Sequence, residues 1–154
     1  MRKIKVNYMS GHQKADKDGI ISELKYKSMH LDRDYGKLYQ SGMFKLAKLN
    51  GCPVNLFLFL CEISSDSNLV RTDISTIEDF MGYYSRATGG EKSYSVVLVR
   101  KAVTQLKEIG LIVPMTRGMY KINPIHFWKG PKEIDRIDSV RNMLEKGLIK
   151  PERT

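Results

Sequence analysis

The fold of this chain is decided by residues 93–122, SYSVVLVRKAVTQLKEIGLIVPMTRGMYKI. Apolar residues recur at steps of three and four, which predicts an amphipathic helix over residues 94–109 with Ser93 as its N-cap and Gly110 as its end. Residues 111–115 then predict a strand, residues 116–118 a tight turn, and residues 119–122 a returning strand. The stretch therefore predicts a surface helix followed directly by a β-hairpin. The inward side of the helix is formed by Val96, Val99, Val103 and Leu106.

Upstream, the pattern predicts four further helical or extended elements. Residues 42–49 favour a short helix with Met43, Leu46 and Leu49 on one face, and Pro53 begins an apolar helix that forms the centre of the core. Residues 68–72 are a short extended piece. Ser75 and Glu78 then fit a capping box that starts another helix, buried through Ile77, Phe80 and Met81.

The two ends of the chain predict smaller elements. Residues 3–8 alternate polar and apolar, and the turn chemistry of residues 16–19 favours a hairpin or arm. Pro131 begins a last helix that carries Ile134, Ile137, Val140 and Leu144.

This order of elements is that of a winged helix-turn-helix domain, in a chain that is mainly α with a small β-wing. We expect a basic N-terminal arm or hairpin over residues 1–38, a winged-helix DNA-binding domain over residues 39–130, and a C-terminal helix and tail over residues 131–154. The length of 154 residues suits one domain with such extensions.

The charge of the chain favours a polyanionic partner. Its 26 Lys and Arg exceed its 17 Asp and Glu, for a net charge of +9 and a pI of about 9.5. The excess lies in residues 1–38 and 111–154, each with nine basic and five acidic groups. Double-stranded DNA is the simplest partner for such a chain.

Other features argue against a membrane or secreted protein. The longest apolar stretch, residues 54–61, is too short to span a bilayer, and residues 1–19 hold no apolar core of a secretory signal. Cys52 and Cys61 lie in one apolar segment, which is typical of buried thiols in a reducing cytoplasm rather than of a disulfide or a metal site. We therefore expect a cytoplasmic protein.

The predicted surface helix has an outward side suited to the edges of bases. Arg and Lys bond guanine, Gln bonds adenine, and an apolar side chain contacts the thymine methyl group, all in the major groove. Basic residues in the preceding turn and in the wing would hold phosphates. The expected recognition-helix residues are Ser93, Tyr94, Val97, Arg100, Lys101, Thr104 and Gln105, and the expected phosphate contacts are Arg86, Lys92, Arg117 and Lys121.

Residues 118–130 resemble a known family. They fit the pattern G-x-Y-x-I-N-P-x-x-F-x-K-G, which is similar to the exit from the wing in plasmid replication initiators of the RepL type and related winged-helix initiators. The order of elements resembles theirs over residues 15–130, from a hairpin turn at Asp18 and Gly19 and a helix entry at residues 37–40 to a recognition helix at residues 99–106. The resemblance implies a bacterial, plasmid-encoded protein that binds a replication origin, supports plasmid maintenance and promotes initiation by host replication proteins, including a helicase. The turn over residues 82–92 and the segment 25–34 depart from the family pattern.

Two alternatives stay open beside origin binding. The same fold serves transcription regulators at promoters, and some winged helices bind protein instead of DNA.

A homodimer is possible through Ile134, Ile137, Leu144 and Leu148, although Arg141 interrupts that seam. Phe127 and Trp128 suit either stacking on bases of a melted origin or anchoring the wing to the core, and we favour the anchor.

We expect no enzymatic activity, cofactor or metal. Residues 89–93, GGEKS, lack the spacing of a phosphate-binding loop and are typical of a flexible turn. Tyr83 and Tyr84 are candidates for a DNA-nicking tyrosine. Such enzymes need a histidine cluster, however, whereas His12, His30 and His126 are scattered along the chain.

Overall fold

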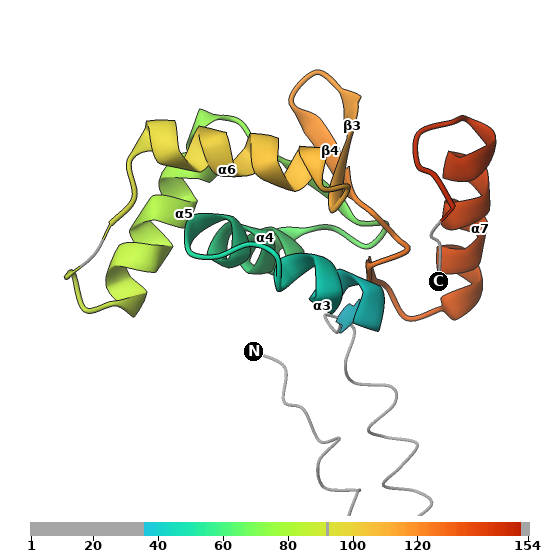
Figure 1. The fold of residues 1–154 in the computed structure, drawn as a ribbon, viewed down its shortest axis with the longest axis horizontal. Helices are drawn as coiled ribbons and strands as arrows, with labels where there is room; N and C mark the ends of the chain where they lie inside the picture. The colour runs from blue at the N-terminus through green and yellow to red at the C-terminus, as the bar shows by residue number, and fades with distance from the viewer. Residues whose placement is uncertain (1–35, 92, 152–154) are drawn as a thin grey trace, which may run out of the picture. The chain divides into compact units, whose positions relative to one another are not determined.

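The computed structural model describes residues 36–91 and 93–151. The chain divides into two units, Met1–Tyr35 and Gly36–Thr154. The strand predicted over residues 3–8 and the turn predicted over residues 16–19 lie outside the described residues. Within the described part of the second unit there are five helices and two small antiparallel sheets (Figure 1). This is a mixed α and β composition, and the expected predominance of helix is only partly met.

The elements follow one another in an order close to that predicted. One sheet has the order β2-β4-β3, and the other pairs β1 with β5. Both sheets are antiparallel, and the first is completed by β2, a strand that comes from far upstream of the β3–β4 hairpin. The elements are β1 (Gly36–Leu38), α3 (Gln40–Leu46), α4 (Cys52–Ile63), β2 (Leu69–Arg71), α5 (Ile74–Ala87), α6 (Val96–Glu108), β3 (Ile112–Thr116), β4 (Met119–Ile122), β5 (Phe127–Lys129) and α7 (Glu133–Glu145).

Helix α4 is the centre of the main core, as its apolar sequence predicts. Pro53 lies in its first turn, where the missing N–H costs no helical hydrogen bond. Leu56, Phe57 and Leu60 are almost fully buried and pack in one cluster with side chains of α5, α6, β3 and β4. Each such side chain contributes about 1.5–3 kcal/mol of hydrophobic free energy. The core therefore fixes α6 and the base of the β3–β4 hairpin on one scaffold.

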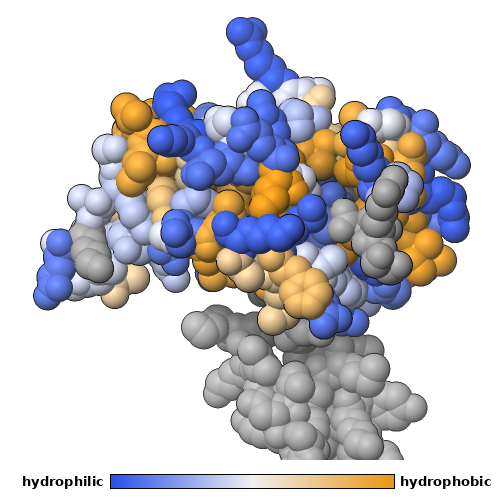
Figure 2. All heavy atoms as spheres, viewed as in Figure 1, coloured by the Kyte–Doolittle hydropathy of each residue, from blue (hydrophilic) through white to orange (hydrophobic). Residues whose placement is uncertain are grey.

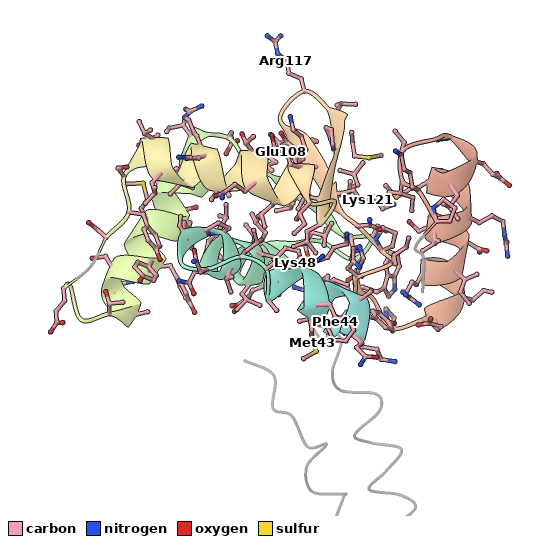
Figure 3. All side chains as sticks on the ribbon, in the orientation of Figure 1. Met43, Phe44, Lys48, Glu108, Arg117 and Lys121 are labelled. Carbon is pink, nitrogen blue, oxygen red and sulfur yellow. The ribbon has the colours of Figure 1, made fainter. Side chains whose placement is uncertain are left out.

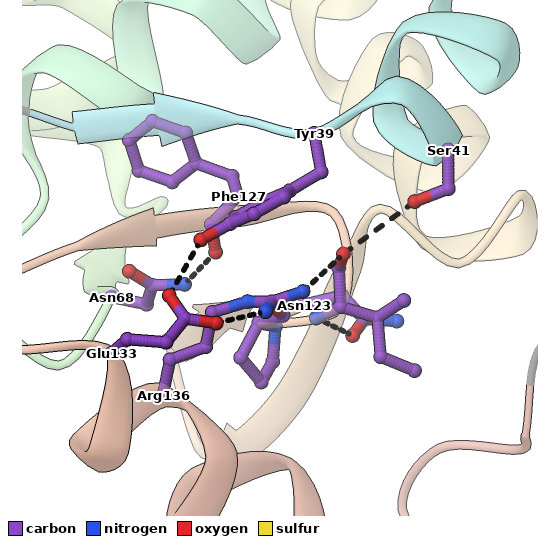
Figure 4. Close-up of polar contacts among 9 residues, drawn as sticks. Tyr39, Ser41, Asn68, Asn123, Phe127, Glu133 and Arg136 are labelled. Carbon is purple, nitrogen blue, oxygen red and sulfur yellow. Dashed lines mark hydrogen bonds and ion pairs between the residues drawn. The ribbon is translucent and has the colours of Figure 1, made fainter.

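Asn68 is fully buried and joins the two sheets. Its backbone adopts φ 66°, a left-handed conformation that Asn tolerates better than most residues. Its side-chain amide donates to the carbonyl oxygen of Phe127 at 2.7 Å (Figure 4). The same side chain also donates to the carbonyl oxygen of Ile122 at 2.9 Å and accepts from the Lys129 N–H at 2.8 Å. These residues are all buried. Removal of the Asn68 side chain would therefore leave two buried carbonyl groups and one buried N–H without this hydrogen-bond partner.

Helix α7 packs against the β3–β4 hairpin through a second, smaller core formed by Val113, Met143 and Ile149 (Figure 1). Arg136 holds the start of this helix in place. Its guanidinium lies 3.7 Å from the centre of the Tyr39 ring, pairs with Glu133 at 2.6 Å and donates to the carbonyls of Pro124 and Ile125 at 2.7 and 3.1 Å (Figure 4). The base of the hairpin is therefore packed on both of its faces, against the main core and against α7.

Three predicted helix starts are wrong by about two residues. Asp73, rather than Ser75, caps α5, because its carboxylate accepts hydrogen bonds from both the N–H and the hydroxyl of Thr76 at 3.0 Å. Ser95, rather than Ser93, caps α6 by accepting from the N–H of Leu98 at 3.2 Å. Helix α7 begins at Glu133, after Lys132, rather than at Pro131.

The expected inward faces of the two end helices are also partly wrong. In α3 the buried residue is Gly42, since a Cβ there would lie 2.8 Å from the His126 carbonyl oxygen. Met43 is consequently turned outward and is 55% exposed, whereas Leu46 and Leu49 pack against the main core. In α7 the buried residue is Met143, and Val140 and Leu144 pack beside it, whereas Ile134 and Ile137 are exposed. In helices that are short or largely exposed, single apolar side chains are weak evidence for which face is buried.

Candidate nucleic-acid interface

Helix α6 presents the outward side that its sequence predicts. Val99, Ala102 and Leu106 are fully buried against the main core, so the opposite side of the helix faces solvent. Val97 is 76% exposed, the largest exposed fraction among the large apolar side chains of the described residues. The predicted residues Arg100, Lys101, Thr104 and Gln105 are exposed beside it.

The cations of α6 are not neutralised by neighbouring acids. Within the described residues, no ion pair joins Arg100, Lys101 or Lys107 to a carboxylate. The helix itself carries one acid, Glu108, in its last turn. The hydroxyl of Thr104 donates to the Arg100 carbonyl at 3.3 Å, which leaves its oxygen able to accept a hydrogen bond. The outward side of α6 therefore offers donors, an acceptor and an apolar group.

Tyr94 does not face outward as predicted. Its ring stacks on that of Tyr84, with centroids 4.2 Å apart, and lies 5.9 Å from that of Phe80. Its hydroxyl accepts from the side-chain amide of Asn55 at 3.1 Å. Burial, and next the hydrogen bond with Tyr84, raise the pKa of Tyr94. These interactions keep Tyr94 outside α6 and attach the start of α6 to α5.

Residues 88–91 and 93–95 lie between α5 and α6, so the turn expected over residues 82–92 is wrong in its bounds, because α5 continues to Ala87. Gly89 and Gly90 adopt φ values of 68° and 80°, which side chains disfavour, so the predicted Gly-Gly turn is confirmed. Ser93 is exposed in this connection. Lys92, a predicted phosphate contact, lies outside the described residues. Arg86, at the end of α5, is exposed, and its guanidinium runs back along α5 to within 3.3 Å of where a Cβ on Gly82 would lie.

The two basic residues predicted for the hairpin lie in different surroundings. Arg117 is exposed at the tip, where Gly118 turns with φ 74°, and Figure 3 shows its side chain pointing away from the rest of the chain. Lys121 is half-buried near the base of the hairpin, on the side that α7 covers. Burial, and next the charge of Lys146, lower the pKa of Lys121. Arg117 is thus placed to contact a ligand, and Lys121 is much less accessible.

Hydrophilic side chains gather over α6 and at the tip of the hairpin on the face drawn in Figure 2, with apolar side chains between them. The whole arrangement is a basic helix with a basic loop projecting beside its C-terminal end (Figure 1). An α-helix of this kind fits the width of the DNA major groove.

Several other predicted residues belong to the core. Phe127 and Trp128 are buried, so the anchoring interpretation of these aromatics is confirmed. Cys52 and Cys61 are buried free thiols, as expected, and burial raises the pKa of Cys52 to about 11. His126 is fully buried, with Nδ1 2.8 Å from the hydroxyl oxygen of Ser41. No group of three His, Cys, Asp or Glu side chains that could hold a metal occurs in residues 36–91 and 93–151.

Sequence reasoning missed the role of Lys129. Its ammonium group is buried and donates to the carbonyl oxygens of Cys61 and Glu62, at the C-terminal end of α4. Together with Asn68, it fixes β5 to the core. The only signal for it was its place in the G-x-Y-x-I-N-P-x-x-F-x-K-G pattern. The described interactions of Ile122, Asn123, Phe127 and Lys129 in that pattern are structural.

Comparison of the chain with protein-family models, with curated proteins and with solved structures found no match. The resemblance to plasmid replication initiators therefore stays a prediction. None of the described helices is long and apolar enough to cross a membrane.

Proposed function

We propose that residues 39–130 form a winged helix, with α6 as the recognition helix and the β3–β4 hairpin as the wing. The support is topological. Helices α4, α5 and α6 enclose one core, and β2 adds a third strand to the hairpin that follows α6 directly. In such a domain the recognition helix and the wing project toward the same partner.

Double-stranded DNA is the partner that this surface suits best. The observation that carries the proposal is the exposed outward side of α6, where Arg100 and Lys101 lie without acidic partners among the described residues. Lys101 or Arg100 would donate to guanine, Gln105 would bond adenine, and Val97 would contact a thymine methyl group. Arg117 at the tip of the wing would hold the phosphate backbone or enter the minor groove.

Within this function, we propose binding at a plasmid replication origin, followed by recruitment of host replication proteins. This narrower proposal rests on the resemblance of residues 118–130 alone. Because the described hydrogen bonds of that stretch hold the wing to the core, the likeness supports a shared fold more strongly than a shared target. A promoter-binding regulator is the second candidate, since its site would need the same α6 surface.

Footprinting of the full chain on fragments that tile the DNA carrying its gene tests the proposal. Protection of repeated sites in one region that supports replication of a reporter plasmid is the result expected of an initiator. Protection confined to a palindrome over a promoter would favour the regulator. The absence of protection at low salt would overturn DNA binding and leave the protein-interaction module.

A further inference from the structure

A cavity of about 310 Å³ lies beside the C-terminal end of α6, away from the proposed base-contacting residues. Three lysines line it, and each comes from a different part of the chain. Lys45 belongs to the last turn of α3, Lys107 to the last turn of α6, and Lys150 follows α7. Three cations brought together from separate elements form a local excess of positive charge.

Packing determines where each lysine lies. The Lys45 ammonium group reaches to 4.0 Å from the position that a Cβ on Gly110 would take, directly after α6. Ile149 is buried in the second core, which fixes the exposed Lys150 beside the cavity. Lys107 is exposed two turns after Arg100, so the two cations lie on the same side of α6. The cavity therefore continues the basic side of α6 past its end.

These positive charges are not balanced locally. Glu108 is the one acidic residue in the lining, and no ion pair involves any of the three lysines in the described part of the chain. A lysine cluster without acidic partners attracts oxyanions, and the lysine ammonium binds phosphate as a point charge without demanding a fixed geometry. A DNA backbone that runs alongside α6 would present phosphates at this position.

We propose that Lys45, Lys107 and Lys150 bind phosphodiester groups of the DNA backbone, outside the site contacted by the recognition helix and the wing. This inference rests on the proposed function. It assigns to the C-terminal segment after α7 a part in DNA binding, through Lys150. It also predicts that the bound duplex extends beyond the base pairs that α6 contacts.

The test compares two double variants of the full chain that remove the same charge. Lys107→Gln with Lys150→Gln alters the cluster, and Lys132→Gln with Lys146→Gln alters exposed lysines at the two ends of α7, outside the cavity. Affinity for one duplex is measured against salt concentration, and hydroxyl-radical footprints are recorded for each protein. Far-UV circular dichroism verifies that both variants are folded.

The cluster variant would release two phosphates of the duplex. We therefore expect the slope of log affinity against log salt to fall by about 1.8, with roughly tenfold weaker binding for each phosphate at 0.1 M salt. This variant should also show no backbone protection at one edge of the footprint, whereas the control variant should keep it. A fall in slope no larger than that of the control, or an unchanged footprint, would overturn this inference while leaving DNA binding intact. Failure of the wild-type chain to bind any duplex would overturn both proposals.

Discussion

Helices α6 and α7 are equally long, with 13 residues each, yet their charged side chains are arranged in opposite ways. Helix α6 has a net charge of +2 from three cations and one acid, and none of its cations forms an ion pair within the described residues. Helix α7 has a net charge of −2, and each of its two arginines pairs with an acid one turn earlier, Arg136 with Glu133 and Arg141 with Asp138.

The difference separates two uses of charge in one small protein. On α7 the Arg136 guanidinium binds groups of the chain itself, and its hydrogen bonds attach that helix to the backbone carbonyls of Pro124 and Ile125. On α6 the exposed cations form no ion pair with any of the described residues. Charges kept without partners on one face are typical of a surface that binds an anion. If α6 is the binding helix and α7 the structural one, substitutions in the two helices should affect different properties.

Removal of the α6 cations should have the largest effect. Arg100→Ala with Lys101→Ala is expected to weaken binding to the cognate duplex by about 1–3 kcal/mol for each base that the variant no longer reaches. Fluorescence anisotropy with a labelled duplex measures this change. Arg141→Ala on α7 is the control, and an equally weakened affinity in that variant would show that net charge, rather than the α6 face, matters.

Removal of Arg136 should have the largest effect on stability. Arg136→Ala leaves two backbone carbonyls without their charged donor and removes the guanidinium from the Tyr39 ring, so the free energy of unfolding should fall by about 2 kcal/mol. Lys101→Ala, on the exposed side of α6, should change it by less than about 0.5 kcal/mol. Urea denaturation compares the two variants, and similar losses in both would contradict the contrast between the helices.

The wing offers a finer comparison between Arg117 and Lys121. Arg117→Ala should lower the salt dependence of DNA binding by about 0.9 in slope, because an exposed cation at the tip contacts one phosphate. Lys121→Ala should leave the slope unchanged, since this lysine is half-buried on the side that α7 covers. An equal fall in both variants would mean that DNA reaches the base of the hairpin.

The smallest expected effect is on the stability of the folded state at low pH. Burial raises the pKa of Glu133, but the hydrogen bonds from Arg136 and Tyr39 outweigh it and lower the pKa below its usual value. The carboxylate therefore stabilises the folded state above the unfolded-state pKa, and this stability is lost as the pH falls through the folded-state pKa. Thermal unfolding between pH 6 and pH 3 should show a smaller loss for Glu133→Gln than for the wild type. Equal losses would show that the pair does not stabilise α7.

The sequence predicts those parts of this protein in which periodic burial decides the structure. In α6 the spacing of Val99 and Leu106 is enough to orient the whole helix, so the exposure of Val97, Arg100 and Lys101 follows. In α3, close packing at Gly42 decides the orientation, and a hydrophobicity pattern does not register a missing side chain.

The sequence pattern also does not predict aromatic and polar interactions between residues that are far apart along the chain. Tyr94 is turned away from solvent by Tyr84 and Asn55, which precede it by many residues. The charge of Lys121 predicts a phosphate contact, yet its accessibility depends on the packing of α7 against the hairpin. Both residues stay candidates for DNA binding by prediction only, and each now has a competing interaction or cover within the fold.

Selection from a randomised duplex library, followed by dimethyl sulfate interference, tests the central claim that α6 contacts bases in the major groove. This reagent methylates N7 of guanine, the atom to which Lys101 or Arg100 would donate. We expect an enriched motif in which methylation of one guanine or more blocks the wild-type chain but has less effect on Lys101→Ala. A library that yields no enriched motif, or a motif insensitive to guanine methylation in both proteins, would contradict the claim.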